Sequence, residues 1–171
     1  MKNITYAIIT YTTEWLNIQS FNSSDVVVDS KTYHKDDFKT DPDFKGVVPT
    51  KIIVGLVGAG GRGGSTGLFQ SGGGGGGGGT VIGILDLTAV EPDSDGHYTY
   101  YVKIGLTSDK ITELRCKDSS GKLLASGRGG GNGGSGSSSG GAGGGCTGTI
   151  AESSGNWFCE IVAMPGGKGG A

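Results

Sequence analysis

The chain has 171 residues, of which 38 are glycine and 4 are proline, and 18% of its residues are charged. A glycine content so far above the usual value of about 7% excludes an ordinary helical or α/β enzyme, and the low proline content excludes a collagen triple helix. The 14 basic and 16 acidic residues give a net charge of −2, which predicts no nucleic-acid partner and no attraction to an anionic membrane.

Residues 1–46 are predicted to be a polar, β-containing segment, with strands over residues 4–13 and 25–29. The segment lacks the uninterrupted apolar run of a signal peptide, and no stretch of the chain approaches the roughly 18 apolar residues that cross a membrane. We therefore expect no membrane insertion. The acidic residues around position 40 favour a solvated turn over a calcium site; they are Asp36, Asp37, Asp41 and Asp43.

Two blocks, residues 55–83 and 127–148, hold 29 of the 38 glycines. Outside these blocks the sequence is that of an ordinary β protein. Alternating or β-branched runs predict strands over residues 51–57, 80–90, 98–106, 111–117, 122–126 and 157–163. No window has a sustained period of 3.6 residues, so we expect almost no helix.

The unbroken run Gly72–Gly79 raises the question of what eight glycines do inside a folded chain. A flexible linker between two domains is one answer, but the flanking pieces are too short to fold alone. The other answer is a set of extended helices with three residues per turn, whose N–H groups bond to neighbouring chains. We predict ordered polyglycine rods over residues 58–64, 72–79 and 127–145, with disordered loops as the alternative.

Two motifs within the glycine blocks are chance matches. Gly58, Gly60 and Gly63 fit a dinucleotide-binding fingerprint, but the helix that it requires would have to contain the glycine run. Arg62 and Arg128 stand in Gly-Arg-Gly-Gly segments, yet two copies in an acidic chain do not make an RNA-binding region.

No pattern of catalytic or metal-ligating residues stands out. His34 and His97 have acidic neighbours, but no hydrolase or metal-binding motif accompanies either one, which favours solvated loops. The odd number of cysteines, without a C-x-x-C pair, favours reduced thiols at Cys116, Cys146 and Cys159. We predict no enzyme activity, no metal and no cofactor.

From Val47 onward, the sequence elements follow an order that is also found in other proteins. Val47, Val48 and Pro49 lead into the strand 51–57, which runs directly into glycines; a polyglycine run, a second strand, a tyrosine-rich strand and a glycine-serine stretch follow. In this order the sequence resembles the glycine-rich modules of bacteriophage tail-fibre and receptor-binding proteins, over about 125 of the 171 residues.

This resemblance implies an all-β fold, a β-sandwich of jelly-roll or TNF-like type with inserted polyglycine II helices, in residues 47–171. Residues 1–46 lie outside the resemblance, and we predict that they form an attachment segment. The implied protein is a virion fibre or spike tip, extracellular after assembly, that recognises a protein or glycan on a host bacterium. It would contact other tail or fibre proteins and form a symmetric oligomer such as a homotrimer. The alternative is a structural connector or decoration subunit without receptor binding.

If the rods form, their interiors offer only backbone to a ligand, so recognition falls to the non-glycine residues between them. Leu68, Phe69 and Gln70 provide an apolar patch beside an amide, suited to a sugar ring or a protein loop. The second interruption provides short hydrogen-bonding groups; they are Asn132, Ser137, Ser138 and Ser139. The alternative is that Leu68 and Phe69 form a hydrophobic plug beneath the rods.

Overall fold

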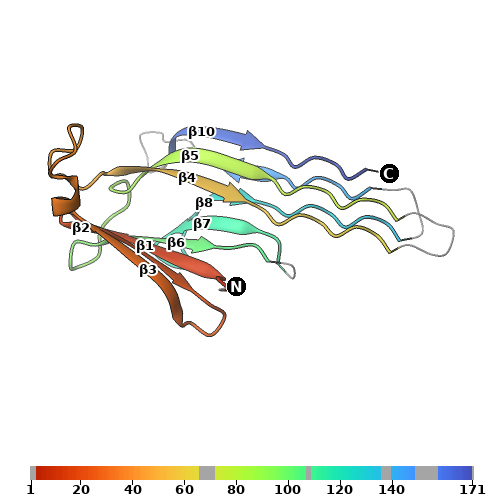
Figure 1. Cartoon of the computed structure of the whole chain (residues 1–171), viewed down its shortest axis with the longest axis horizontal. Helices are drawn as coiled ribbons and strands as arrows, with labels where there is room; N and C mark the ends of the chain where they lie inside the picture. The colour runs from red at the N-terminus through yellow and green to blue at the C-terminus, as the bar shows by residue number, and fades with distance from the viewer. Residues whose placement is uncertain (1–2, 66–71, 107–108, 136–139, 149–157, 171) are drawn as a thin grey trace.

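A computed structural model of the protein describes residues 3–65, 72–106, 109–135, 140–148 and 158–170 (Figure 1). Its elements in chain order are β1 (Tyr6–Tyr11), β2 (Trp15–Phe21), β3 (Val27–His34), the short 3-10 helix η1 (Lys35–Phe38), β4 (Lys51–Val57), β5 (Thr80–Asp86), β6 (Tyr98–Lys103), β7 (Thr112–Cys116), β8 (Leu123–Gly127), β9 (Cys146–Gly148) and β10 (Phe158–Met164). The protein is therefore nearly all β.

The strands form two antiparallel sheets that pack as a sandwich. One sheet has seven strands in the order β3-β2-β1-β6-β7-β8-β9, and the other has three in the order β10-β5-β4. Within the large sheet, Ile9 of β1 lies opposite Ile18 of β2 on one side and Tyr100 of β6 on the other. The predicted all-β sandwich is confirmed.

The core lies between the sheets because apolar residues alternate with others along each strand. In β5, Val81 and Leu85 are buried while Ile82 faces outward. Tyr100, also buried, donates a hydrogen bond from its hydroxyl to the Asp86 carbonyl at 3.0 Å, and burial raises the pKa of this hydroxyl. The fully packed residues are Ile9, Tyr11, Leu16, Val48, Leu56, Val81, Leu85, Leu87, Val90, Tyr100, Leu114, Leu124 and Ala125.

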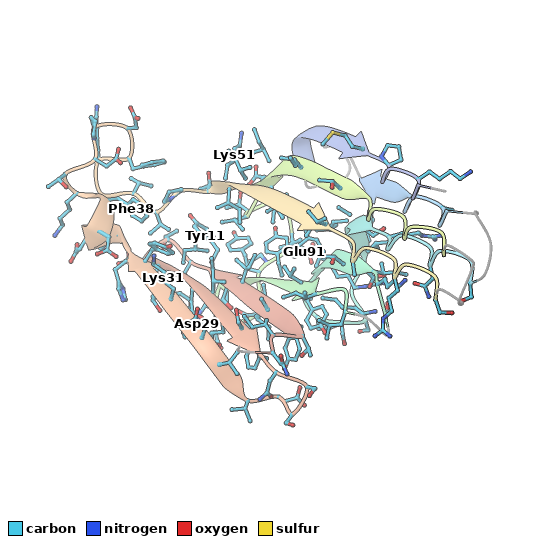
Figure 2. All side chains as sticks on the ribbon, turned by 45° about the vertical axis from the view of Figure 1, so that its right-hand side comes forward. Tyr11, Asp29, Lys31, Phe38, Lys51 and Glu91 are labelled. Carbon is cyan, nitrogen blue, oxygen red and sulfur yellow. The ribbon has the colours of Figure 1, made fainter. Side chains whose placement is uncertain are left out.

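The N-terminal segment is part of this sandwich in the structure. β1 pairs with β6 along its whole length, from Tyr6 opposite Lys103 to Tyr11 opposite Tyr98. Tyr11 is buried between the two sheets (Figure 2). The division predicted at residue 46 thus does not interrupt the hydrogen-bonded sheet.

The acidic region after β3 is a turn. Asp37 accepts a hydrogen bond from the His34 backbone N–H at 2.8 Å, which starts η1, and Asp36 pairs with Lys39 at 2.8 Å. None of the four residues of η1 is buried. Over the described part of the chain, no helix has the length and apolar character needed to cross a membrane.

Candidate functional site

Five extended glycine-rich segments project from one end of the sandwich. We call them rod 1 (residues 58–65), rod 2 (72–79), rod 3 (128–135), rod 4 (140–145) and rod 5 (165–170). Rods 1, 2 and 5 continue β4, β5 and β10, whereas rods 3 and 4 continue β8 and β9. They run side by side away from the strands (Figure 1). The two glycine blocks are therefore parts of one domain, inserted into its sheets.

Hydrogen bonds between rods recur at every third residue. Gly58, Gly61 and Gly64 of rod 1 donate to the carbonyl oxygens of Gly79, Gly76 and Gly73 of rod 2 at 2.9, 2.7 and 2.8 Å. A repeat of three residues per turn is that of the polyproline II helix, with glycine retaining the N–H that proline lacks. The predicted rods are confirmed, with two corrections. The segment 127–145 contains two rods, and residues 165–170, for which no rod was predicted, form a fifth.

Rod 2 is the centre of the bundle. It donates to rod 3 from Gly73, Gly76 and Gly79, and to rod 5 from Gly74 and Gly77. It accepts bonds from rods 1 and 4, and rods 3 and 4 also bond to each other. The rods thus form two layers, rods 1, 2 and 5 above rods 3 and 4, and each layer extends one sheet of the sandwich.

The close approach of these backbones leaves no room for side chains. A Cβ atom on Gly76 would lie 2.0 Å from the Ala142 carbonyl oxygen, and one on Gly61 would lie 1.8 Å from that of Gly131. Real Cβ atoms essentially never approach other atoms below 3.0 Å. Packing therefore requires glycine at these positions. The glycine segments are ordered rods and not free linkers.

The far ends of the rods meet at one end of the molecule. Gly64 donates to Gly73 at 2.8 Å, Gly73 donates to Gly134 at 3.1 Å, and Ser65 donates from its backbone to the Ser135 hydroxyl at 3.4 Å. Both interruptions of the glycine blocks start and finish here. The predicted site residues Leu68, Phe69, Gln70, Ser137, Ser138 and Ser139 lie outside the described residues.

Asn132 is the one predicted site residue that the structure describes, and its side chain has internal partners. Its Oδ1 accepts hydrogen bonds from the Arg62 backbone N–H at 2.9 Å and from Lys110 Nζ at 2.6 Å. Lys110 Nζ also donates to the Gly130 carbonyl at 3.0 Å. Asn132 therefore ties rods 1 and 3 to the loop before β7. Lys110 cannot be recognised from the sequence as part of this site, because no local pattern connects it with Asn132, 22 positions away.

Charge is unevenly distributed along the molecule. The rod segments contain Arg62, Arg128 and Lys168, all exposed, and no acidic residue among the positions that the structure describes. The net charge of −2 thus divides into about +3 on the rods and −5 on the rest of the chain, since 3 of the 14 basic residues lie on the rods. The rods are consequently more favourable to neutral or anionic ligands than to cationic ones.

The other cluster with chemical potential lies in the turn before β6. Ligand atoms of Asp93, Asp95 and His97 lie within 4.8 Å of one another. The Asp93 carboxylate already accepts backbone hydrogen bonds from Asp95 at 3.0 Å and from His97 at 2.9 Å. These bonds, with the His97 bond foremost, lower the pKa of Asp93. These hydrogen bonds explain the cluster as a turn that the Asp93 side chain holds together.

Comparisons with known proteins give no relative. No family model matches the chain, and searches of curated proteins and of solved structures also find no match.

Proposed function

We propose that the protein is the tip of a bacteriophage fibre or spike, and that it attaches to a receptor on the host surface with the far end of its rods. The observation that carries this proposal is that rod 1 ends, rod 2 begins and rod 3 ends at the same end of the bundle, where Gly64 bonds to Gly73 and Gly73 bonds to Gly134. Both interruptions of the glycine blocks are thus joined to the rods at that end. Binding residues on loops held by a rigid scaffold are a common arrangement in recognition proteins.

The rods suit this role because, apart from their far end, they present few groups that a ligand could bind. Their interior presents only backbone atoms, most of them bonded to a neighbouring rod. Specific recognition needs side chains, and the segment of chain between rods 1 and 2 contains the apolar and aromatic pair Leu68 and Phe69. A protein loop or a glycan of the bacterial surface is the corresponding ligand class.

The test is binding of the purified chain to bacterial cells, together with its ability to block phage adsorption. We expect Phe69→Ala to abolish binding while the melting temperature stays unchanged. The matched control is Phe44→Ala, since Phe44 is 40% exposed and contacts Phe38 of η1, which lies at the opposite end of the molecule (Figure 1). That control should bind as the unmodified chain does.

A drop of several degrees in the Phe69→Ala melting temperature, with binding lost only through unfolding, would show that Phe69 is a hydrophobic plug. Binding to no strain of a broad bacterial panel would reject receptor recognition. The structural connector is the second candidate, and the exposed apolar side chains of the three-stranded sheet favour it, because such surfaces commonly contact other proteins. A connector would bind purified fibre proteins and not cells.

A further inference from the structure

The outer face of the three-stranded sheet is apolar, although it points away from the core. Ile53 is 79% exposed, Val57 59%, Ile82 42% and Met164 46%. Lys51 marks this side of β4 in Figure 2, opposite the side that faces Tyr11. Antiparallel sheets with one solvated face normally carry polar residues there. An apolar outer face therefore indicates that something covers it.

The same face continues over the layer of rods 1, 2 and 5. In rod 2, two of every three N–H groups point to rods 3 and 5. With three residues per turn, the N–H groups of Gly75 and Gly78 point in the remaining direction, away from rods 3 and 4. Within the described residues they make no hydrogen bond, and neither do those of Gly60 and Gly63 in rod 1. The array of rods is open on this side.

The flank of rod 1, by contrast, is closed by the chain itself. The N–H groups of Ala59, Arg62 and Ser65 are bonded to the Lys110 carbonyl at 3.1 Å, to Asn132 Oδ1 at 2.9 Å and to Ser135 Oγ at 3.4 Å. The Val57 carbonyl accepts from the Thr112 hydroxyl at 2.8 Å. The outer edge of rod 1 is thus blocked against pairing with another chain, whereas the outer face of rods 1, 2 and 5 is open.

The face is large enough for a stable interface. β4 has seven residues and rod 1 has eight, so at about 3.4 Å per strand residue and about 3.1 Å per rod residue the strand and rod together extend roughly 49 Å. Three chains about 4.8 Å apart give a width of roughly 14 Å. The resulting ~700 Å² per copy, or ~1,400 Å² for a pair, lies within the range of specific interfaces.

We propose that a second copy of this chain covers this face, in a two-fold dimer whose axis runs along the rods. Strands then face strands, with the side chains of Ile53, Val57 and Ile82 between them, and rods face rods. A partner for the open rods must itself be free of side chains at a three-residue spacing, and the all-glycine rod 2 of a second copy meets this requirement. The two layers inside one chain already pack in this way, with apolar side chains between the sheets and bare backbone between the rods.

Sedimentation equilibrium of the full chain at about 100 μM tests the proposal. We expect twice the chain mass of 17.2 kDa, and a return to the monomer mass in Ile53→Asp. The control is Val26→Asp, since Val26 is 55% exposed in the turn between β2 and β3, and it should remain dimeric. A monomeric or trimeric unmodified chain, or a dimeric Ile53→Asp variant, would overturn the proposal.

A second variant keeps the test informative if Ile53→Asp fails to fold. Gly55 lies on the same face with nothing within 4 Å of a Cβ placed on it, so Gly55→Arg leaves the monomer undisturbed and blocks the approach of a second copy. Amide exchange gives an independent readout. The N–H groups of Gly75 and Gly78 should become protected as the protein concentration rises, and exchange that is independent of concentration would contradict the rod contact.

Discussion

The sandwich and the rod bundle are stabilised in opposite ways. In the sandwich, side chains such as Leu85 and Tyr100 fill the space between two sheets. In the bundle the chains touch directly, and main-chain hydrogen bonds at every third residue replace side-chain packing. The two regions are therefore vulnerable to opposite changes. The sandwich is weakened when atoms are removed, and the bundle is weakened when atoms are added.

The bundle also depends on the sandwich. Glycine loses more conformational freedom on folding than any other residue, and each hydrogen bond returns only about 0.5–1.5 kcal/mol. Rods 1 to 5 are all anchored in strands at one end, which reduces the freedom that remains to be lost. We infer that the rods would not form without the sheets.

The largest expected effect follows from removing atoms from the sandwich. Leu85 is fully buried, so Leu85→Ala should lower the free energy of unfolding by about 2–5 kcal/mol through the cavity that it leaves. Leu106 is 42% exposed, and Leu106→Ala is the control with little effect. Urea denaturation of both variants measures the difference, and equal losses would contradict the assignment of the core.

Adding atoms to the bundle should come next. Gly76→Val inserts a side chain against the Ala142 carbonyl, and we expect a cost of roughly 1–3 kcal/mol or more, as for overpacking. Gly145 is exposed with nothing within 4 Å of a Cβ, so Gly145→Val should be nearly neutral. An unchanged melting temperature in Gly76→Val would mean that rod 2 is a free linker.

A smaller effect is expected from the brace between the rods and the loop before β7. Asn132→Ala removes the acceptor of two hydrogen bonds, from Arg62 and Lys110, and should destabilise the protein by about 1 kcal/mol. Asn132→Asp retains the acceptor and should restore most of the loss. Thermal melts of the two variants test this, and a full loss in both would point to another role for the side chain.

The smallest effect concerns an exposed ion pair at the base of the rods. The hydrogen bond from Lys103 lowers the pKa of the Asp109 carboxyl, with help from the Ile111 N–H. A lowered carboxyl pKa stabilises the fold above the unfolded pKa, and this stability is lost as the pH falls through the folded pKa. Because both groups are partly solvated, Lys103→Ala should cost less than about 1 kcal/mol at pH 7.

NMR titration provides the sharper readout for that pair. The pKa of Asp109 should rise toward its ordinary value in Lys103→Ala, and the stability difference between variant and parent should vanish once the pH is below the folded pKa of Asp109. A difference that persists in acid would assign the effect to packing of the lysine side chain.

Sequence patterns predict much of this structure. The strand predicted over residues 51–57 coincides with β4, and those after it match within a few residues. β2 was not predicted, although Leu16 and Ile18 alternate with polar residues there; Trp15 and Phe21 on its outward-facing positions obscure the pattern. The bracing role of Asn132 depends on its hydrogen bond with Lys110. A contact between residues so far apart in the chain produces no local sequence pattern from which it could be predicted.

The three-residue repeat of the rods also restricts how the gene for this chain can change. Because rod 2 is all glycine and anchored in β5, losing one glycine from the run Gly72–Gly79 would move each earlier glycine into the next place and keep every N–H direction. Losing one glycine between β8 and Asn132 would instead turn the Asn132 side chain by about 120°, away from Arg62 and Lys110. The glycine run before Asn132 should therefore vary among descendants in steps of three codons, while the run Gly72–Gly79 can vary one codon at a time.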